Sequence, residues 1–253
     1  MTHIFRPPAD LPQLDERETR VQLAACYRLV AHYGMTDLVY THISARVPGK
    51  ADEFLINPYG MMFDEITASS LVKIDHEGNL VEDSPWPVNQ AGFVIHSAVH
   101  DGRADVACVL HTHTRAGVAV SCLEEGLLPM NQHSLLFYGR LSYHDYEGIA
   151  LDLDEQKRLV ADLGENRAMI LRNHGLLTAG RTIPEAFELM FNLEMSCKMQ
   201  IDAMATGRPL RIPSDEVRER TAAQWRRDDK PMGMQSWPAL MRMLDRKDPS
   251  YRD

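Results

Sequence analysis

Three histidines carry the most specific chemical signal in this sequence. His111 and His113 stand two residues apart at the end of the apolar run 106–110, and His174 follows a second apolar segment, 168–171. Residues i and i+2 of a strand point to the same face, so the imidazoles of His111 and His113 can reach one ion. If these two segments form neighbouring strands, the imidazole of His174 can reach the same ion. Three histidine ligands with an open fourth position describe a catalytic metal site.

The pair H-x-H alone is a modest signal in a chain with 11 histidines. Two polar residues at a strand end, one of them solvated, are the alternative interpretation. If the site forms, neutral imidazoles predict a divalent metal cofactor. Zn²⁺ is favoured, and Mn, Co or Fe of similar geometry are the other candidates.

The elements that must position these histidines alternate between strands and helices. Hydrophobic patterning predicts strands over residues 38–47, 54–57, 71–75, 106–114, 168–171 and 176–178, with short strands possible around 135–137. Helices are predicted over residues 15–33, 89–100, 115–123, 154–163 and 184–205. A hairpin turn is expected at residues 76–79.

The chain of 253 residues is predicted to form one domain and a tail. Residues 1–13, which contain three prolines, are expected to be an extended arm. Residues 14–210 show no linker or break in composition and form the predicted domain. Residues 211–253 are rich in proline and are expected to form a tail of short helices.

Composition limits the partners that the chain can have. A formal net charge of −9 argues against nucleic acid, which requires a basic face. No apolar run reaches the roughly 20 residues that span a bilayer, and the N-terminus lacks an apolar signal core. Four cysteines without CxxC spacing fit a reducing compartment, so we expect a cytoplasmic protein. The expected partner is a small-molecule substrate.

Four segments resemble the class II aldolase/adducin family. They are VLHTHTRAG at residues 109–117, ILRNHGLL at 170–177, THISAR at 41–46 and INPYGM at 56–61. They follow the family order and lie within residues 18–205, which is most of the chain. The resemblance implies an α/β fold of three layers, α/β/α, with a central, mainly antiparallel sheet. It also implies a metal at His111, His113 and His174, and a homotetramer with the site near a subunit interface.

The chain departs from the sugar-phosphate aldolases of this family at the acid/base position. Those enzymes carry a glutamate where Gly92 stands here, and no carboxylate lies between Ser84 and Val99. The pattern N-x-A-G-F-x-x-H at residues 89–96 is instead similar to the adducin-type branch. Abstraction of a proton from dihydroxyacetone phosphate therefore has no evident base.

The phosphate pocket differs as well. The corresponding pairs here are Thr41-His42, Tyr59-Gly60 and Gln90-Ala91. Phosphate is bound by exposed backbone N–H groups or by dedicated cations, and neither is evident at these pairs. We predict that the chain does not act on a sugar phosphate.

Five further residues are candidates for the site. His133 aligns near a tyrosine that reaches a neighbouring subunit's site, and it is the candidate proton donor; a loop histidine at a subunit contact is the alternative. Arg115 could grip a substrate carboxylate or face solvent. His42 is a substrate contact or a core imidazole. Tyr59 and Asn89 complete the predicted substrate-binding set.

Two other groups of polar residues lie in the same part of the sequence. His96 and His100 lie i,i+4 on one predicted helix but lack the H-E-x-x-H motif, so packing or solvent is expected for His100 and His96 is left open. The polar, aromatic run 143–147 could line the mouth of the site or be only a loop.

These features predict a metal-dependent carbon–carbon lyase of the aldolase or decarboxylase type. The expected substrate is a small non-phosphorylated keto or hydroxy acid, or an aldehyde, that reacts through a metal-stabilised enolate. The missing glutamate favours decarboxylation, which starts without a base. The alternatives are a non-catalytic adducin-like scaffold and an Fe(II)-dependent oxygenase in the same pocket.

Overall fold

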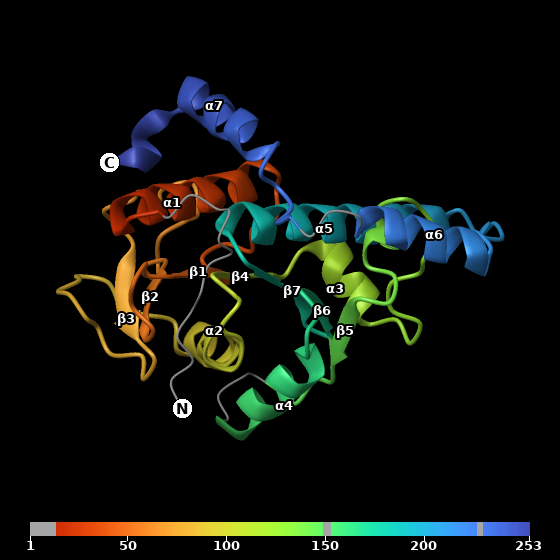
Figure 1. Ribbon diagram of the computed structural model, residues 1–253, viewed down its shortest axis with the longest axis horizontal. Helices are drawn as coiled ribbons and strands as arrows, with labels where there is room; N and C mark the ends of the chain where they lie inside the picture. The colour runs from red at the N-terminus through yellow and green to blue at the C-terminus, as the bar shows by residue number, and fades with distance from the viewer. Residues whose placement is uncertain (1–13, 149–152, 227–229) are drawn as a thin grey trace.

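A seven-stranded sheet forms the centre of the computed structural model, which describes residues 14–148, 153–226 and 230–253 (Figure 1). The strands are β1 His42–Arg46, β2 Glu53–Ile56, β3 Val72–Asp75, β4 Cys108–Thr112, β5 Leu141–His144, β6 Ala168–Leu171 and β7 Gly175–Gly180. They lie in the order β3-β2-β1-β4-β7-β6-β5. Every neighbouring pair is antiparallel except β5 and β6. The prediction of a mainly antiparallel sheet is confirmed.

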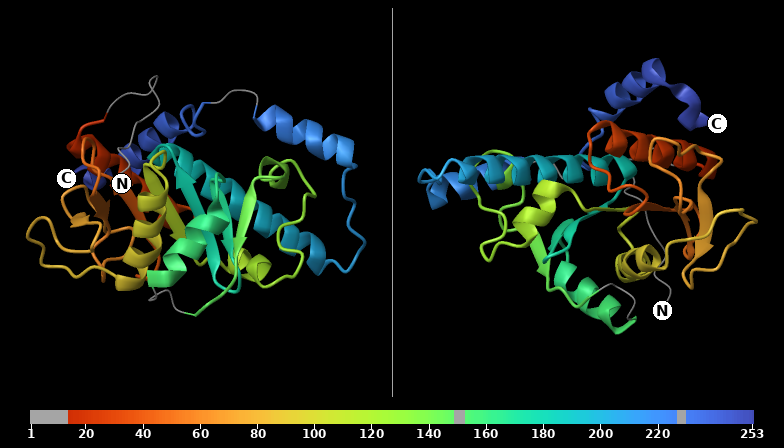
Figure 2. Two further views of the ribbon diagram at one scale, coloured as in Figure 1. Left: turned by 60° about the horizontal axis from the view of Figure 1, so that its bottom comes forward. Right: turned by 180° about the vertical axis from the view of Figure 1, so that it is seen from behind.

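Helices cover both faces of this sheet and complete the three layers that were predicted. On one face lie α1 Glu16–His32, α3 Arg115–Ser121 and the long α5 Ile183–Ala205, and on the other lie α2 Gln90–Gly102 and α4 Leu153–Leu163 (Figures 1 and 2). Among the described helices, none is both long and apolar enough to cross a membrane.

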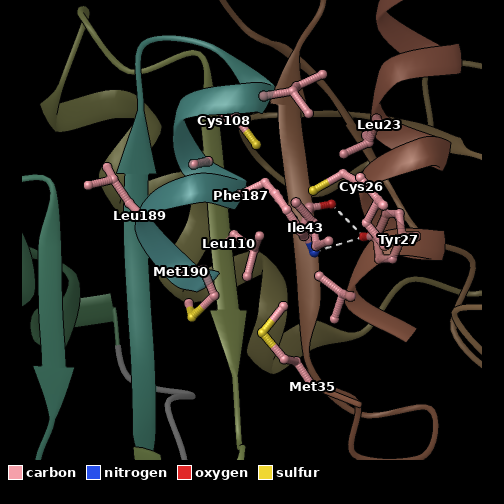
Figure 3. Close-up of a cluster of buried hydrophobic side chains, with 14 of the residues drawn as sticks. Leu23, Cys26, Tyr27, Met35, Ile43, Cys108, Leu110, Phe187, Leu189 and Met190 are labelled. Carbon is pink, nitrogen blue, oxygen red and sulfur yellow. Dashed lines mark hydrogen bonds between the residues drawn. The ribbon is translucent and has the colours of Figure 1, made fainter. Parts of the chain in front are cut away.

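The alternation of side chains along β4 separates the two layers of the core. Cys108 and Leu110 pack in the large apolar cluster beneath α1 and α5, whereas Val109 packs in the smaller cluster beneath α2 and α4 (Figure 3). Because successive strand residues point to opposite faces, His111 shares the α2/α4 side with Val109. Strand β4 therefore places the imidazole of His111 on the face of the sheet that carries the smaller apolar cluster.

Strand β1 is fixed to helix α1 through a buried tyrosine. The Tyr27 hydroxyl accepts a hydrogen bond from the Ile43 N–H at 2.7 Å and lies 2.5 Å from the Ile43 carbonyl (Figure 3). It also lies 2.9 Å from Asn57 Oδ1. A tyrosine buried in the core needs such partners. These bonds fix the backbone beside His42.

Most predicted elements are confirmed within a few residues, with two exceptions. The short strands expected around residues 135–137 are wrong, because Ser134–Leu136 forms a 3₁₀ helix, η1. Strand β5 was not predicted, and its last two residues belong to the run 143–147, which was expected to line the site or to be only a loop.

The tail contains the short helices that were expected. These are α6 Asp215–Trp225, α7 Trp237–Lys247 and the 3₁₀ helix η2 Pro249–Arg252. Helix α7 returns over α1 (Figure 1). The domain boundary at residue 210 stays a prediction, and the expected arm 1–13 lies outside the described residues.

Candidate metal centre

The three predicted histidines meet at one end of the central strands. His111 lies in β4, His113 follows its end, and His174 lies in the tight turn between β6 and β7. The expectation that the two histidine-bearing strands are neighbours is wrong, because β7 lies between β4 and β6. The rings still converge, since the turn carries His174 back beside β7 and toward β4.

The geometry of the three rings fits a divalent cation. His113 Nε2 lies 2.8 Å from His111 Nε2 and 2.9 Å from His174 Nε2. All three ligand atoms lie within 4.8 Å of one another. Neutral nitrogens that point lone pairs at one another at this distance repel unless a cation lies among them. The three rings could therefore hold a divalent metal.

Hydrogen bonds on the far side of two rings set which nitrogen is free. His111 Nδ1 lies 2.9 Å from the Leu176 carbonyl, and His113 Nδ1 lies 3.1 Å from Asp37 Oδ2. A carbonyl and a carboxylate both accept, so each Nδ1 carries the hydrogen and each Nε2 keeps its lone pair. This arrangement is typical of metal-binding histidines.

Burial favours the neutral form that a metal ligand requires. It lowers the pKa of His111 well below its usual range, with further contributions from His174 and His113. Burial, with His113 and His144, lowers the pKa of His174 to about 4. Both rings are then neutral at pH 7 without having to release a proton when a metal binds.

The turn that carries His174 depends on two special residues. Asn173 has a positive φ of 55°, a conformation that asparagine tolerates better than most residues, and its N–H donates to the Ser121 carbonyl at 3.2 Å. A Cβ on Gly175 would lie 2.4 Å from the Thr112 carbonyl oxygen. Only glycine lets the turn approach β4 this closely, so the sequence N-H-G encodes the position of His174.

His42 is the predicted substrate residue that the structure brings closest to the triad. It is paired in register with His111, and the two ring centroids are 5.4 Å apart. The side chain is buried at 4% exposure. A Cβ on Gly92 would lie 2.0 Å from His42 Cδ2. The His42 ring therefore fills the space that any side chain at position 92 would need.

Tyr59 and Asn89 lie on adjacent segments beside the start of α2. The Tyr59 N–H donates to the Pro87 carbonyl at 2.9 Å, and Asn89 immediately precedes the helix. Both residues are half-buried. Their roles in substrate binding stay predictions.

Arg115 and His133 are placed differently. Arg115 is exposed at the first position of α3, two residues beyond His113. His133 precedes η1, which packs against α6, and within the described chain it makes no hydrogen bond or ring contact with the triad. A role for His133 at this site would require another subunit and stays a prediction.

Several neighbours of the triad were not assigned from the sequence. Asp37 was given no role, and the run 143–147 was only suggested as a lining. The Tyr146 ring lies 6.4 Å from that of His174, and a small cavity of about 10 Å³ next to His174 is lined in part by His144 and Glu155. No local motif marks Asp37, because its contact with His113 spans 76 residues.

Comparison with known proteins agrees with the geometry. The sequence profile described as Class II Aldolase and Adducin N-terminal domain matches residues 21–201. A crystal structure of an aldolase II superfamily protein from Pseudomonas syringae is 51% identical and has a TM-score of 0.91, over 97% of this chain and 98% of that one. An L-fuculose 1-phosphate aldolase from Glaciozyma antarctica is 28% identical with a TM-score of 0.85, over 98% of each chain.

Alpha-adducin of Rattus norvegicus is also similar to this chain. The two are 39% identical over 250 residues, which are 91% of this chain but only 33% of the adducin. The similarity therefore concerns one part of that longer protein.

Proposed function

This chain belongs to the class II aldolase/adducin family, and from that membership we propose that it is a metal-dependent carbon–carbon lyase. The substrate class that we propose is a small keto or hydroxy acid, or an aldehyde, without a phosphate group. The reaction is aldol cleavage or decarboxylation. The convergence of His111, His113 and His174 on one point is the observation that carries this proposal.

Different residues of the chain would have different roles in such a reaction. A divalent ion held by the three Nε2 atoms would supply a Lewis acid that withdraws charge from a substrate oxygen as the carbon–carbon bond breaks. Asp37 and the Leu176 carbonyl hold two of the rings in the orientation that this requires. We propose that Arg115, which is exposed two residues beyond His113, pairs with a substrate carboxylate.

The absence of a side chain at position 92 supports decarboxylation over aldol cleavage. Decarboxylation leaves the electrons of the broken bond on the substrate as CO₂ departs, so it needs a proton donor only afterwards. Aldol cleavage requires a base that first takes a hydroxyl proton. We propose that the donor is the imidazole of His133, supplied by another subunit.

The proposal that the substrate lacks a phosphate rests on the residues around α2. His42 is buried, and burial lowers its pKa well below its usual range, with further contributions from His96 and His113. A neutral ring does not neutralise a phosphate dianion. Tyr59, half-buried at the edge, adds a bulky ring where backbone N–H groups would have to be accessible.

A homotetramer with the site near a subunit interface is part of the proposal. Three exposed apolar side chains lie in segments that contact the triad. Leu38, at 63% exposure, and Tyr40, at 47%, follow Asp37, and Tyr146, at 54%, has its ring 6.4 Å from that of His174. Such side chains gather where a protein surface is covered by a partner. Analytical ultracentrifugation measures the assembly, and a monomer at micromolar concentration would contradict this part.

A non-catalytic scaffold is the second candidate function. The greater identity to alpha-adducin than to the L-fuculose 1-phosphate aldolase favours it, and we place the chain in the adducin-like branch that lacks the aldolase glutamate. A scaffold needs no metal, so the metal content of the native protein separates the two functions.

The test uses elemental analysis of the purified protein and of three variants. His111→Ala and His113→Ala are expected to lose the metal, because two imidazoles hold an ion far less tightly than three. His76→Ala, at an exposed turn, is the matched control and should retain it. A folded wild-type protein without bound metal would contradict the lyase and favour the scaffold.

Activity is measured on the metal-loaded protein with a panel of non-phosphorylated keto and hydroxy acids, by release of CO₂ or of an aldehyde. We expect activity in the wild-type protein and in the control His76→Ala, and no activity in His111→Ala or His113→Ala. Metal binding without either product across the panel would contradict the proposed substrate class.

A further inference from the structure

Four buried polar side chains form a continuous hydrogen-bonded chain that leads away from the metal centre. His42 Nδ1 lies 3.0 Å from His96 Nε2, His96 Nδ1 lies 2.7 Å from Ser44 Oγ, and Ser44 Oγ lies 2.7 Å from His100 Nε2. Each side chain is at most 4% exposed. We call these residues, His42, His96, Ser44 and His100, the histidine chain.

The fold explains why these residues meet. His42 and Ser44 are two apart on β1 and share one face of the sheet, whereas His96 and His100 are four apart on α2 and share one face of the helix. Helix α2 packs on that face of the sheet. The histidine chain thus occupies an interface that is usually apolar, where an unsatisfied polar group is costly.

The single hydroxyl proton of Ser44 makes the histidine chain directional. Ser44 lies between two ring nitrogens, so it donates to one and accepts from the other. Each neutral histidine likewise donates through one nitrogen and accepts through the other. The direction set at either end therefore holds along the whole histidine chain.

The surroundings of His100 set that direction. Burial and the Arg46 guanidinium lower the pKa of His100 well below its usual range, so its ring is neutral. His100 Nδ1 is buried and has no hydrogen-bond partner among the described residues. A buried N–H without a partner is rare and costly, so the hydrogen lies on His100 Nε2, which donates to Ser44 Oγ.

The remaining bonds follow from this start. Ser44 Oγ donates to His96 Nδ1, and His96 Nε2 donates to His42 Nδ1. All three histidines are then Nε2–H tautomers, and His42 Nε2 carries a hydrogen. No hydrogen bond to His42 Nε2 is present among the residues that the structure describes.

We propose that His96, Ser44 and His100 are positioning residues that hold His42 in one orientation and one tautomer, so that its Nε2–H donates a hydrogen bond to a ligand bound at the three-histidine centre. The register of His42 with His111 and the absence of a side chain at Gly92 provide the place for this contact. The ligand contact rests on the proposed function, whereas the tautomers do not.

The tautomers are measured by ¹⁵N–¹H correlation spectra of zinc-loaded protein labelled with ¹⁵N-histidine. The expected result is the Nε2–H form for His42, His96 and His100 in the wild-type protein. The Nδ1–H form at all three, or rapid exchange between forms at His42, would overturn the proposal without any variant.

Ser44→Ala interrupts the histidine chain with a minimal change in volume. His42 is then expected to populate both tautomers. Ser196→Ala is the matched control, because Ser196 is equally buried but donates to the Asn192 carbonyl within α5. An unchanged His42 signal in Ser44→Ala would show that the histidine chain does not position the ring.

The ligand contact is tested with acetohydroxamate, a small bidentate chelator, by calorimetry on zinc-loaded protein. If half to a third of the molecules keep the competent tautomer, the Kd rises by about two- to threefold in Ser44→Ala, with zinc content unchanged. An equal Kd in wild type and Ser44→Ala would overturn the ligand contact. Zinc that is absent from the wild type would instead contradict the proposed function, so the two failures are distinguishable.

Discussion

Gly175 is the residue whose replacement tests the geometry of the metal centre most directly. It follows His174 in the turn between β6 and β7, and a Cβ there would meet the Thr112 carbonyl oxygen at 2.4 Å. The same Cβ would lie 3.2 Å from His113 Cδ2 and 3.4 Å from His111 Cε1. Gly175→Ala thus places a methyl group between β4 and the turn that supplies the third histidine.

The size of the effect follows from these distances. Restoring an ordinary contact with the carbonyl requires the turn to move by about 1 Å, whereas metal–ligand distances vary by only about 0.2 Å. Overpacking of this kind costs about 1–3 kcal/mol of unfolding free energy. For a chain of this size that corresponds to a fall in Tm of about 2–12 °C. Zinc affinity is expected to fall by about 10- to 100-fold, as when supporting contacts of a metal site are lost.

Gly180→Ala provides the matched control at the other end of the same strand. A Cβ on Gly180 would lie 2.4 Å from the Ala186 backbone nitrogen, far along β7 from the histidines. Zinc affinity is measured by competition with a chromophoric chelator, and Tm by calorimetry on metal-free protein. We expect both variants to lose stability and only Gly175→Ala to lose zinc affinity. Equal zinc affinity in the two variants would refute the argument that the close approach of this turn builds the site.

Three further predictions concern the same centre. Asp37→Ala is expected to weaken zinc binding about tenfold. This is the lower end of the range for residues that orient a metal ligand, because the Asp37 side chain is 43% exposed. An unchanged zinc affinity would show that Asp37 does not orient His113. Urea unfolding of metal-free protein should show the free energy of unfolding falling as pH drops from about 6.5 toward 4, because the unfolded state binds protons that the buried His111 and the half-buried His174 do not bind. A flat profile over this range would contradict the neutral state of these two rings. Inorganic phosphate and L-fuculose 1-phosphate should leave Tm unchanged, and a rise at low concentration would contradict the phosphate-free substrate.

Elements with strong local signals could be predicted from the sequence. The helix expected at residues 15–33 is α1, with Asp15 accepting from the Glu18 N–H at its start and Gly34 at a positive φ beyond its end. The helix expected at residues 184–205 is α5, which Thr182 caps. These signals involve residues three or four apart, so they can be recognised from the sequence alone.

Elements that depend on distant partners could not be predicted in the same way. Strand β5 has a polar, aromatic composition, and it is a strand because it pairs in parallel with β6, more than 20 residues later. The position of β7 between β4 and β6 is also a property of the whole sheet. The meeting of the histidines was predicted, but the reason given for it was wrong: a turn, and not adjacent strands, brings His174 into place.

His42 and Gly92 show what takes the place of the carboxylate that is missing at position 92. The sequence shows only that position 92 has no carboxylate. In the structure, the His42 ring lies where a side chain at position 92 would begin, and His96 and Ser44 hold that ring in place. A histidine at 42 in this orientation and any side chain at 92 exclude each other sterically. His42 Nε2, the nitrogen that the histidine chain leaves for a ligand, carries a hydrogen and cannot take a proton from the substrate. A reaction that begins without proton abstraction is therefore the one that such a site favours.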